Sequence, residues 1–183
     1  MYKILIVDDE SIEREGISFL IEKYKLPLEV AQATNGKTAL EYMRTHPIDI
    51  LLTDVKMPQM DGLELARHTF EKYPDVRILV FSAYGEFEFA KKAMAAQAVS
   101  YLLKPIEVDE FQRVMAQILA RCDELAEKKK DEQQRGEEYR QQLLFRLVTG
   151  TGLGKAHITE EWFSGQTLCL LHVQTENDYF ATN

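Results

Sequence analysis

The feature that most constrains the fold is an alternation of short apolar runs with longer amphipathic stretches, from residue 2 to about residue 120. The runs have the length of buried strands, and in the stretches between them apolar residues recur every three or four positions, as on one helix face. Strands separated by helical segments predict a doubly wound α/β domain with a parallel sheet covered on both faces. The expected strands cover residues 2–7, 28–31, 49–54, 77–82 and 99–103. Helices are expected around residues 17–24, 39–43, 63–73 and 87–94, and from 108 onward.

Composition excludes several classes of protein. The chain has 183 residues, 45% hydrophobic and 28% charged, which favours a globular domain plus an additional segment. The formal net charge of -8 argues against nucleic-acid binding by these residues. The early apolar run is too short for a secretory signal or a membrane span, so no membrane attachment is expected. Cys122 and Cys169 form neither a metal-binding spacing nor a disulfide framework, which favours a reducing cytoplasm.

The segment after the α/β pattern divides into two parts. Residues 1–120 form the first predicted domain, and residues 121–148, rich in Glu, Lys, Gln and Arg, are predicted to form a long helix. Its apolar seam weakens at 129–136 and returns at Tyr139, which leaves two alternatives, a dimeric coiled coil and a single solvated helix. After a glycine-rich break, residues 149–183 indicate the start of a truncated further domain.

Polar residues of related chemistry follow four of the five predicted strands. They are Asp8-Asp9, Asp54, Ser82 and Lys104. The carboxyl ends of parallel strands meet at one edge of a sheet, so these side chains are expected to converge there. Asp8-Asp9 alone could be a solvated turn, but Asp54 and Lys104 at matching strand ends argue against that. Carboxylates that repel one another call for a cation, and hard oxygen ligands suit Mg²⁺.

This set of groups predicts phosphoryl chemistry on a carboxylate. A carboxylate can act as a nucleophile and form an aspartyl phosphate. Mg²⁺ and the ammonium of Lys104 could balance the charge of the phosphoryl oxygens, and the hydroxyl of Ser82 could donate a hydrogen bond to one of them. A cis Lys104-Pro105 bond would direct the lysine back toward the site, although most bonds of this type are trans.

The strand-end motifs together resemble the receiver domain of bacterial two-component response regulators, over residues 1 to about 120. The motifs that carry the resemblance are Asp8-Asp9, Thr53-Asp54-Val55-Lys56-Met57-Pro58, Asp61-Gly62, Phe81-Ser82-Ala83 and Tyr101-Leu102-Leu103-Lys104-Pro105. The resemblance implies a flavodoxin-like sheet with strand order 2-1-3-4-5, followed here by a long C-terminal helix and the truncated second domain.

The resemblance also implies a role for each site residue. Asp54 is the expected phosphoacceptor and Lys104 the phosphate partner. For Mg²⁺, the expected ligands are Asp9 and Asp54 directly, Asp8 through water, and the backbone carbonyl of Lys56. Ser82 and Tyr101 resemble the switch pair of the family.

The implied function is a phosphorylation-dependent response regulator. It would receive a phosphoryl group from a sensor histidine kinase, promote its own Mg²⁺-dependent phosphorylation and dephosphorylation, and otherwise catalyse no reaction. The run from Phe81 to Ala90 and the long charged helix resemble regulators with an AraC-type helix-turn-helix. No such motif occurs in this chain, so DNA binding would belong to sequence outside it. The alternative is a receiver that acts only through protein contacts.

Two enzyme classes fit the sequence poorly. A haloacid-dehalogenase-type hydrolase has a second aspartate two residues after its nucleophile, where this chain has Lys56. A dinucleotide-binding enzyme has a glycine-rich turn after its first strand, and residues 8–11 offer none.

The switch itself can be stated as a hypothesis. Phosphorylation adds about 1.5 to 2 negative charges, which would draw Ser82 inward and let Tyr101 turn from solvent toward the core. The changed surface would favour one homodimer over another, and the long helix would carry the change onward. The alternative is that Tyr101 is an ordinary half-buried strand residue.

Overall fold

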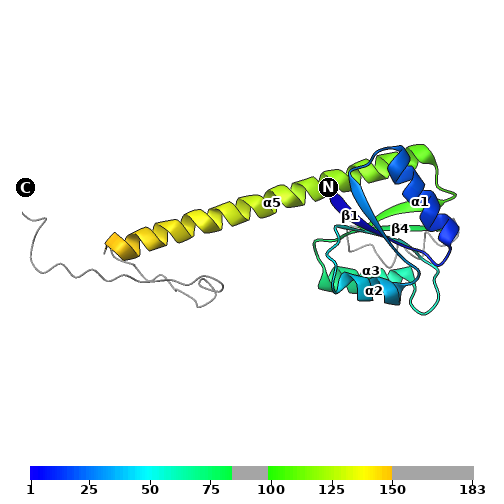
Figure 1. Ribbon diagram of the computed structural model, residues 1–183, viewed down its shortest axis with the longest axis horizontal. Helices are drawn as coiled ribbons and strands as arrows, with labels where there is room; N and C mark the ends of the chain where they lie inside the picture. Colours follow the sequence, from blue (N-terminus) through cyan, green and yellow to red (C-terminus); the bar gives the residue numbers. More distant parts are fainter. Residues whose placement is uncertain (84–98, 150–183) are drawn as a thin grey trace, which may run out of the picture. The chain divides into compact units, whose positions relative to one another are not determined.

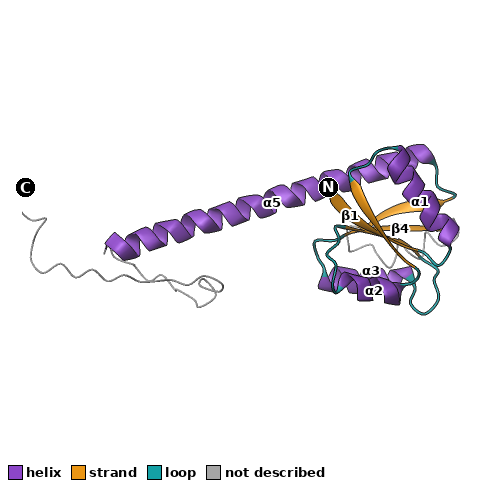
Figure 2. Ribbon diagram, in the orientation of Figure 1, coloured by secondary structure: helices purple, strands orange, loops and turns teal. Residues whose placement is uncertain are grey.

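The chain forms a five-stranded parallel sheet with helices on both faces (Figures 1 and 2). The computed structural model describes residues 1–83 and 99–149. The strands are β1 (Tyr2–Val7), β2 (Leu28–Ala33), β3 (Ile50–Asp54), β4 (Arg77–Ala83) and β5 (Val99–Lys104). They are ordered β2-β1-β3-β4-β5, and every neighbouring pair is parallel. The predicted fold class and strand order are therefore confirmed, with β2 at an edge.

The helices are distributed over the two faces of the sheet. They are α1 (Ser11–Lys23), α2 (Gly36–Met43), α3 (Gly62–Lys72) and α5 (Val108–Thr149). Buried residues of α1 and of the first part of α5 share one core with the sheet, whereas α2 and α3 share the other. Figure 1 shows α2 and α3 together beneath the strands.

Successive side chains along the central strands point to opposite faces of the sheet, and this produces the two cores. In β1, Ile4 and Ile6 belong to the core under α1 and α5, whereas Leu5 and Val7 belong to the core under α2 and α3. All four side chains are fully buried. Burying a side chain of this size stabilises the fold by about 1.5 to 3 kcal/mol, so burial on both faces makes the middle of the sheet rigid.

Local capping fixes where two of the helices begin. The side chain of Asn35 accepts a hydrogen bond from the backbone N–H of Thr38 at 3.0 Å and so caps α2. Asp61 does the same for α3 by accepting from the N–H of Glu64 at 2.7 Å. Each cap satisfies an N–H group that has no partner inside the helix.

Helix α5 packs on the sheet through its first turns. Phe111, Met115, Ile118 and Cys122 are buried in the core under α1 and α5. This first stretch of α5 therefore packs within the domain, while Val108 at its start is 38% exposed. The long C-terminal helix is confirmed as far as Thr149. No helix of the described residues is long and apolar enough to cross a membrane.

Two predicted features fall on residues that the structure does not describe. These are the helix expected around 87–94 and the further domain expected over 149–183. The chain divides into two compact units, residues 1–132 and 133–183. The division into segments 1–120, 121–148 and 149–183 stays a prediction.

Candidate functional site

Three chain segments meet at the carboxyl edge of the sheet. Asp8 follows β1, Asp54 ends β3 and Lys104 ends β5. The strands are parallel and in register, with Asp54 paired to Phe81 and Lys104 to Ala83, so their ends lie at one edge. The expected convergence of the residues at positions 8, 54 and 104 is thus observed.

Lys104 joins the two carboxylates. Its Nζ lies 3.1 Å from Oδ2 of Asp8 and 3.1 Å from Oδ1 of Asp54. Asp8 is only 1% exposed and Asp54 only 7%. Two buried carboxylates sharing one ammonium leave a cluster with an excess of negative charge. The Lys104–Pro105 peptide bond is cis.

Backbone groups hold the other carboxylate oxygens. The N–H of Glu10 donates to Oδ1 of Asp8 at 2.7 Å, and the N–H of Lys56 donates to Oδ2 of Asp54 at 3.1 Å. Both donors lie two residues after the acceptor, so the turn that follows each strand orients the carboxylate. Side-chain rotation is restricted on both residues, and the oxygens therefore have defined positions.

Burial and charge shift the pKa values of the cluster. Burial raises the pKa of Asp54, and the charge of Asp8 adds to this, while the hydrogen bond and charge of Lys104 oppose it; the pKa ends above its ordinary value. Burial lowers the pKa of Lys104, but the hydrogen bonds and charges of Asp54 and Asp8 outweigh burial and raise it overall. The amine therefore stays protonated at neutral pH.

The donor set fits a hard divalent cation that keeps several waters. Asp8 and Asp54 supply buried carboxylate oxygens, and the one ammonium leaves their charge incompletely balanced. Asp9 is exposed, and its side chain makes no hydrogen bond or ion pair among the described residues. No three His, Cys, Asp or Glu side chains in that part of the chain form a metal cage by themselves. A cation at this site would thus need backbone oxygens or water as further ligands.

Ser82 and Tyr101 form a pair next to this cluster. Their hydroxyl groups are hydrogen bonded to each other. Ser82 is fully buried in β4, and Tyr101 in β5 is partly buried and packs against the core under α2 and α3. The Tyr101 side chain therefore points toward Ser82 and the core in this structure. This is the inward orientation that the switch hypothesis expects after phosphorylation.

Three contacts at the site were not foreseen from the sequence. Lys104 Nζ lies 4.3 Å from the ring centroid of Phe81, and Nη1 of Arg14 donates to the backbone carbonyl of Asp8 at 2.7 Å. A Cβ on Gly62 would lie 1.8 Å from the backbone oxygen of Asp54. Phe81 could have been found because it lies directly opposite Asp54 in the neighbouring strand, two residues before β4 ends. Nothing local in the sequence indicates the other two contacts.

Comparisons with known proteins agree with this geometry. A family model described as the response regulator receiver domain matches residues 4–116. A protein of Bacillus subtilis (strain 168), described as the uncharacterized transcriptional regulatory protein YesN, is 41% identical over 121 residues, which are 66% of this chain and 33% of that protein. The transcriptional regulatory protein DegU of Brevibacillus brevis is 31% identical over 118 residues, which are 63% of this chain and 50% of DegU. The chain thus spans a third to a half of the length of these relatives.

Solved structures show the same fold. A two-component transcriptional regulator AraC from Clostridium phytofermentans is 35% identical with a TM-score of 0.64, covering 68% of this chain and 97% of its own. The REC domain of the response regulator AraT from Geobacillus stearothermophilus is 38% identical with a TM-score of 0.62, covering 70% and 98%. With the family match over residues 4–116 and the cluster of Asp8, Asp54 and Lys104 at the sheet edge, the chain belongs to the response regulator receiver domains of two-component systems.

Proposed function

We propose that this protein is a response regulator that receives a phosphoryl group on Asp54 from a sensor histidine kinase. The observation that carries the proposal is the position of Asp54, at a strand end, buried, and 3.1 Å from the ammonium of Lys104. Receiver domains are signalling modules, so the domain would catalyse only its own phosphorylation and dephosphorylation. The cytoplasmic location expected from its cysteine usage stays a prediction.

The proposed reaction is a displacement at phosphorus. An oxygen of the Asp54 carboxylate forms a new bond to phosphorus, and the bond from phosphorus to the imidazole nitrogen of the kinase breaks. The nitrogen keeps the electron pair and takes up a proton from solvent. Lys104 would stay near the transferred oxygens and offset their charge, and Asp8 would keep the lysine aligned.

A magnesium ion is the cofactor that we propose for this step. Asp9, Asp54 and the backbone carbonyl of Lys56 would be its protein ligands, and Asp8 would contact it through water. When bound, it would neutralise charge on the phosphoryl oxygens. The buried carboxylates with incompletely balanced charge support this proposal.

We propose that Ser82 and Tyr101 report the modification to the surface. The hydroxyl of Ser82 would donate to a phosphoryl oxygen, which requires it to leave its hydrogen bond with Tyr101. The Tyr101 ring already points toward the core here. Phosphorylation would therefore remove its hydrogen bond with Ser82 and would not need to turn the ring from solvent to core. This refines the expected movement from solvent toward the core.

The proposed output is regulation of transcription through a homodimer. The names of YesN, DegU and the AraC-type structure support a transcriptional role. Contact with DNA would require a domain outside this chain. We propose that the end of α5 contributes to the dimer as a coiled coil, because the apolar seam returns there at Tyr139, Leu143 and Leu147.

Labelling with a small phosphodonor such as acetyl phosphate tests the site. Wild type should be labelled when Mg²⁺ is present and not when it is chelated. Asp54→Asn should abolish the label, whereas Asp75→Asn, an exposed aspartate outside the site, should leave it unchanged. Labelling retained in Asp54→Asn would move the phosphoacceptor elsewhere.

A further inference from the structure

Helix α5 leaves the sheet gradually along one face. Ile118 is 1% exposed and Cys122 is 5% exposed in the core under α1 and α5. One turn further, Leu125 is only partly buried, and the side chain of Lys129 is 55% exposed. These residues follow each other at intervals of four, three and four, so they share one face of the helix. Burial therefore fades over two turns and does not end abruptly.

Two polar contacts tie this fading stretch to the end of the sheet opposite Asp54. The hydroxyl of Tyr2, at the start of β1, donates to Oδ1 of Asp123 at 2.5 Å. Nζ of Lys129 lies 2.8 Å from Oδ2 of Asp75, in the connection between α3 and β4. The hydrogen bond to Asp123, with burial and the charge of that carboxylate, raises the pKa of Tyr2 to about 12, so the phenol remains a donor at physiological pH.

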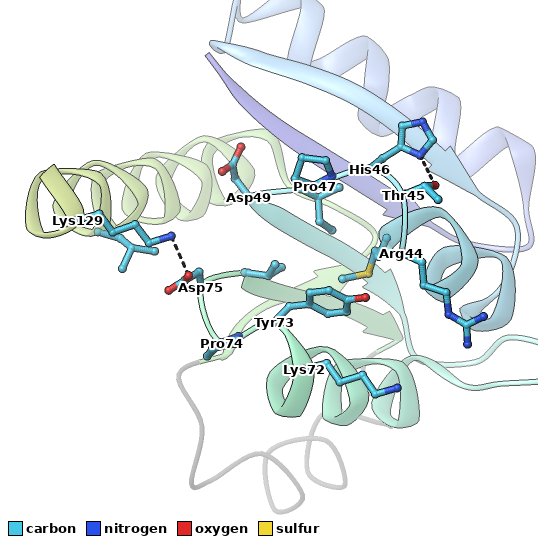
Figure 3. A pocket seen from close by; sticks show the side chains of 14 residues that line it. Arg44, Thr45, His46, Pro47, Asp49, Lys72, Tyr73, Pro74, Asp75 and Lys129 are labelled. Atoms are coloured by element: carbon cyan, nitrogen blue, oxygen red, sulfur yellow. Dashed lines mark hydrogen bonds and ion pairs between the residues drawn. The ribbon is translucent and has the colours of Figure 1, made fainter. Parts of the chain in front are cut away.

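A cavity of about 520 Å³ lies between the helix and the loops it touches (Figure 3). Leu125 and Lys129 of α5 line it on one side, and Pro47, Ile48, Tyr73 and Asp75 line it from the loops. In Figure 3 the ion pair between Lys129 and Asp75 spans one side of this space. Helix α5 thus contacts these loops through the ends of side chains and does not pack closely against them. Moving the helix away from the loops would therefore expose little apolar core.

The sequence after Leu125 also sets this stretch apart. The next seam positions are Lys129, Glu132 and Gly136, none of which favours pairing with a second helix. Lys129 is paired with Asp75 of its own domain. The seam therefore has a first part buried in the domain, a polar middle part, and an apolar part from Tyr139 onward.

We propose that residues 123–129 of α5 form a releasable latch on the receiver domain, closed by the Tyr2–Asp123 and Asp75–Lys129 contacts. With the latch closed, the helix is fixed to the domain as far as Lys129. With the latch open, its fixed part ends near Cys122, where burial is nearly complete. The latch sets the point from which the helix can move.

Hydrogen exchange on the full chain tests the latch. Helices of this kind are stabilised chiefly by packing, so amides of residues 123–132 should exchange faster when the latch is weakened. Lys129→Ala should speed their exchange by a factor of about 1.4 to 5, the range given by 0.2 to 1 kcal/mol for an exposed ion pair. Tyr2→Phe, which keeps the ring and removes the donor, should have a similar effect. Amides of residues 111–120 should not change.

Matched variants separate the latch from a general effect on the helix. Lys128→Ala removes a neighbouring exposed lysine that has no ion pair among the described residues, and should leave exchange unchanged. Combining Asp75→Lys with Lys129→Asp restores an opposite-charge pair and should recover most of the protection. The proposal would be overturned if Lys128→Ala and Lys129→Ala changed exchange equally. It would also be overturned if the charge-swapped double variant, Asp75→Lys with Lys129→Asp, did not regain protection.

Discussion

The proposed role of Asp54 requires its carboxyl group to be both buried and ionised, and these two requirements oppose each other. A nucleophile for phosphoryl transfer must be ionised and shielded from water, yet burial raises the pKa of this carboxyl group above its ordinary value. The hydrogen bond and charge of Lys104 reduce that penalty without removing it. The folded state therefore holds the charged form of Asp54 at a cost in stability.

This conflict predicts that removing the charge stabilises the protein. Because the folded pKa of Asp54 is raised, the folded state binds more protons than the unfolded state above the ordinary value of 3.8, and stability falls as pH rises through the folded pKa. Asp54→Asn should therefore increase the free energy of unfolding at pH 7, because it removes the buried charge that the folded state disfavours. At pH 3 the difference should vanish. Urea unfolding across this pH range measures it.

The control is Asp9→Asn, an exposed carboxylate at the same edge. Surface substitutions of this kind change stability by less than about 0.5 kcal/mol. A gain for Asp54→Asn that does not vary with pH would contradict the explanation from burial.

Ser82 and Tyr101 offer a second test at the scale of single residues. Ser82→Ala and Tyr101→Phe each remove one hydroxyl of a hydrogen bond and should each lower the free energy of unfolding by about 1 kcal/mol. Because both changes break the same bond, the double variant should lose less than the sum of the two. Chemical denaturation of the four proteins measures the coupling, and strict additivity would show that the bond contributes nothing.

At the scale of elements, the start of α3 is placed against β3, the strand that ends at Asp54. The N–H of Gly62 donates to the carbonyl of Val55 at 2.9 Å, and a Cβ on Gly62 would lie 1.8 Å from the backbone oxygen of Asp54. Only glycine permits this approach without moving backbone. The helix and the site carboxylate are thus positioned together.

Gly62→Ala should therefore disturb both stability and the site. We expect a loss of about 3 kcal/mol in the free energy of unfolding, the upper range for overpacking, together with slower labelling by acetyl phosphate. Gly16→Ala is the matched control, since Gly16 lies within α1 with nothing within 4 Å of an added Cβ. It should stabilise the protein slightly. Equal effects of the two substitutions would contradict the close approach.

Gly136 marks a weak point in the second part of α5. It lies in the interior of a helix and has open space around an added Cβ. Gly136→Ala should stabilise the helix locally by about 1 kcal/mol, which corresponds to about a fivefold slower exchange of nearby amides. Hydrogen exchange of residues 133–140 measures this, and unchanged exchange would show that the glycine does not weaken the helix.

At the scale of the whole molecule, hydrophobic periodicity was enough to predict the sheet, and strand ends were enough to predict where Asp8, Asp54 and Lys104 meet. Both follow from chain-local patterns and one rule of parallel sheets. The contacts of Arg14 and Gly62 could not be predicted, because they depend on how a helix seats against a strand end. The apolar residues of α5 between Phe111 and Cys122 pack on the sheet, which the spacing of apolar residues alone does not specify.

The proposed function requires one acyl phosphate at one residue, so the position of the modification in the chain is the decisive measurement. After reaction with acetyl phosphate and Mg²⁺, borohydride reduction converts a phosphorylated aspartate to homoserine, which peptide mass spectrometry can place in the chain. We predict homoserine at position 54 in the wild-type protein and at no position in Asp54→Asn. Reduction at position 8 or 9, or none in protein shown to be folded, would contradict the assignment.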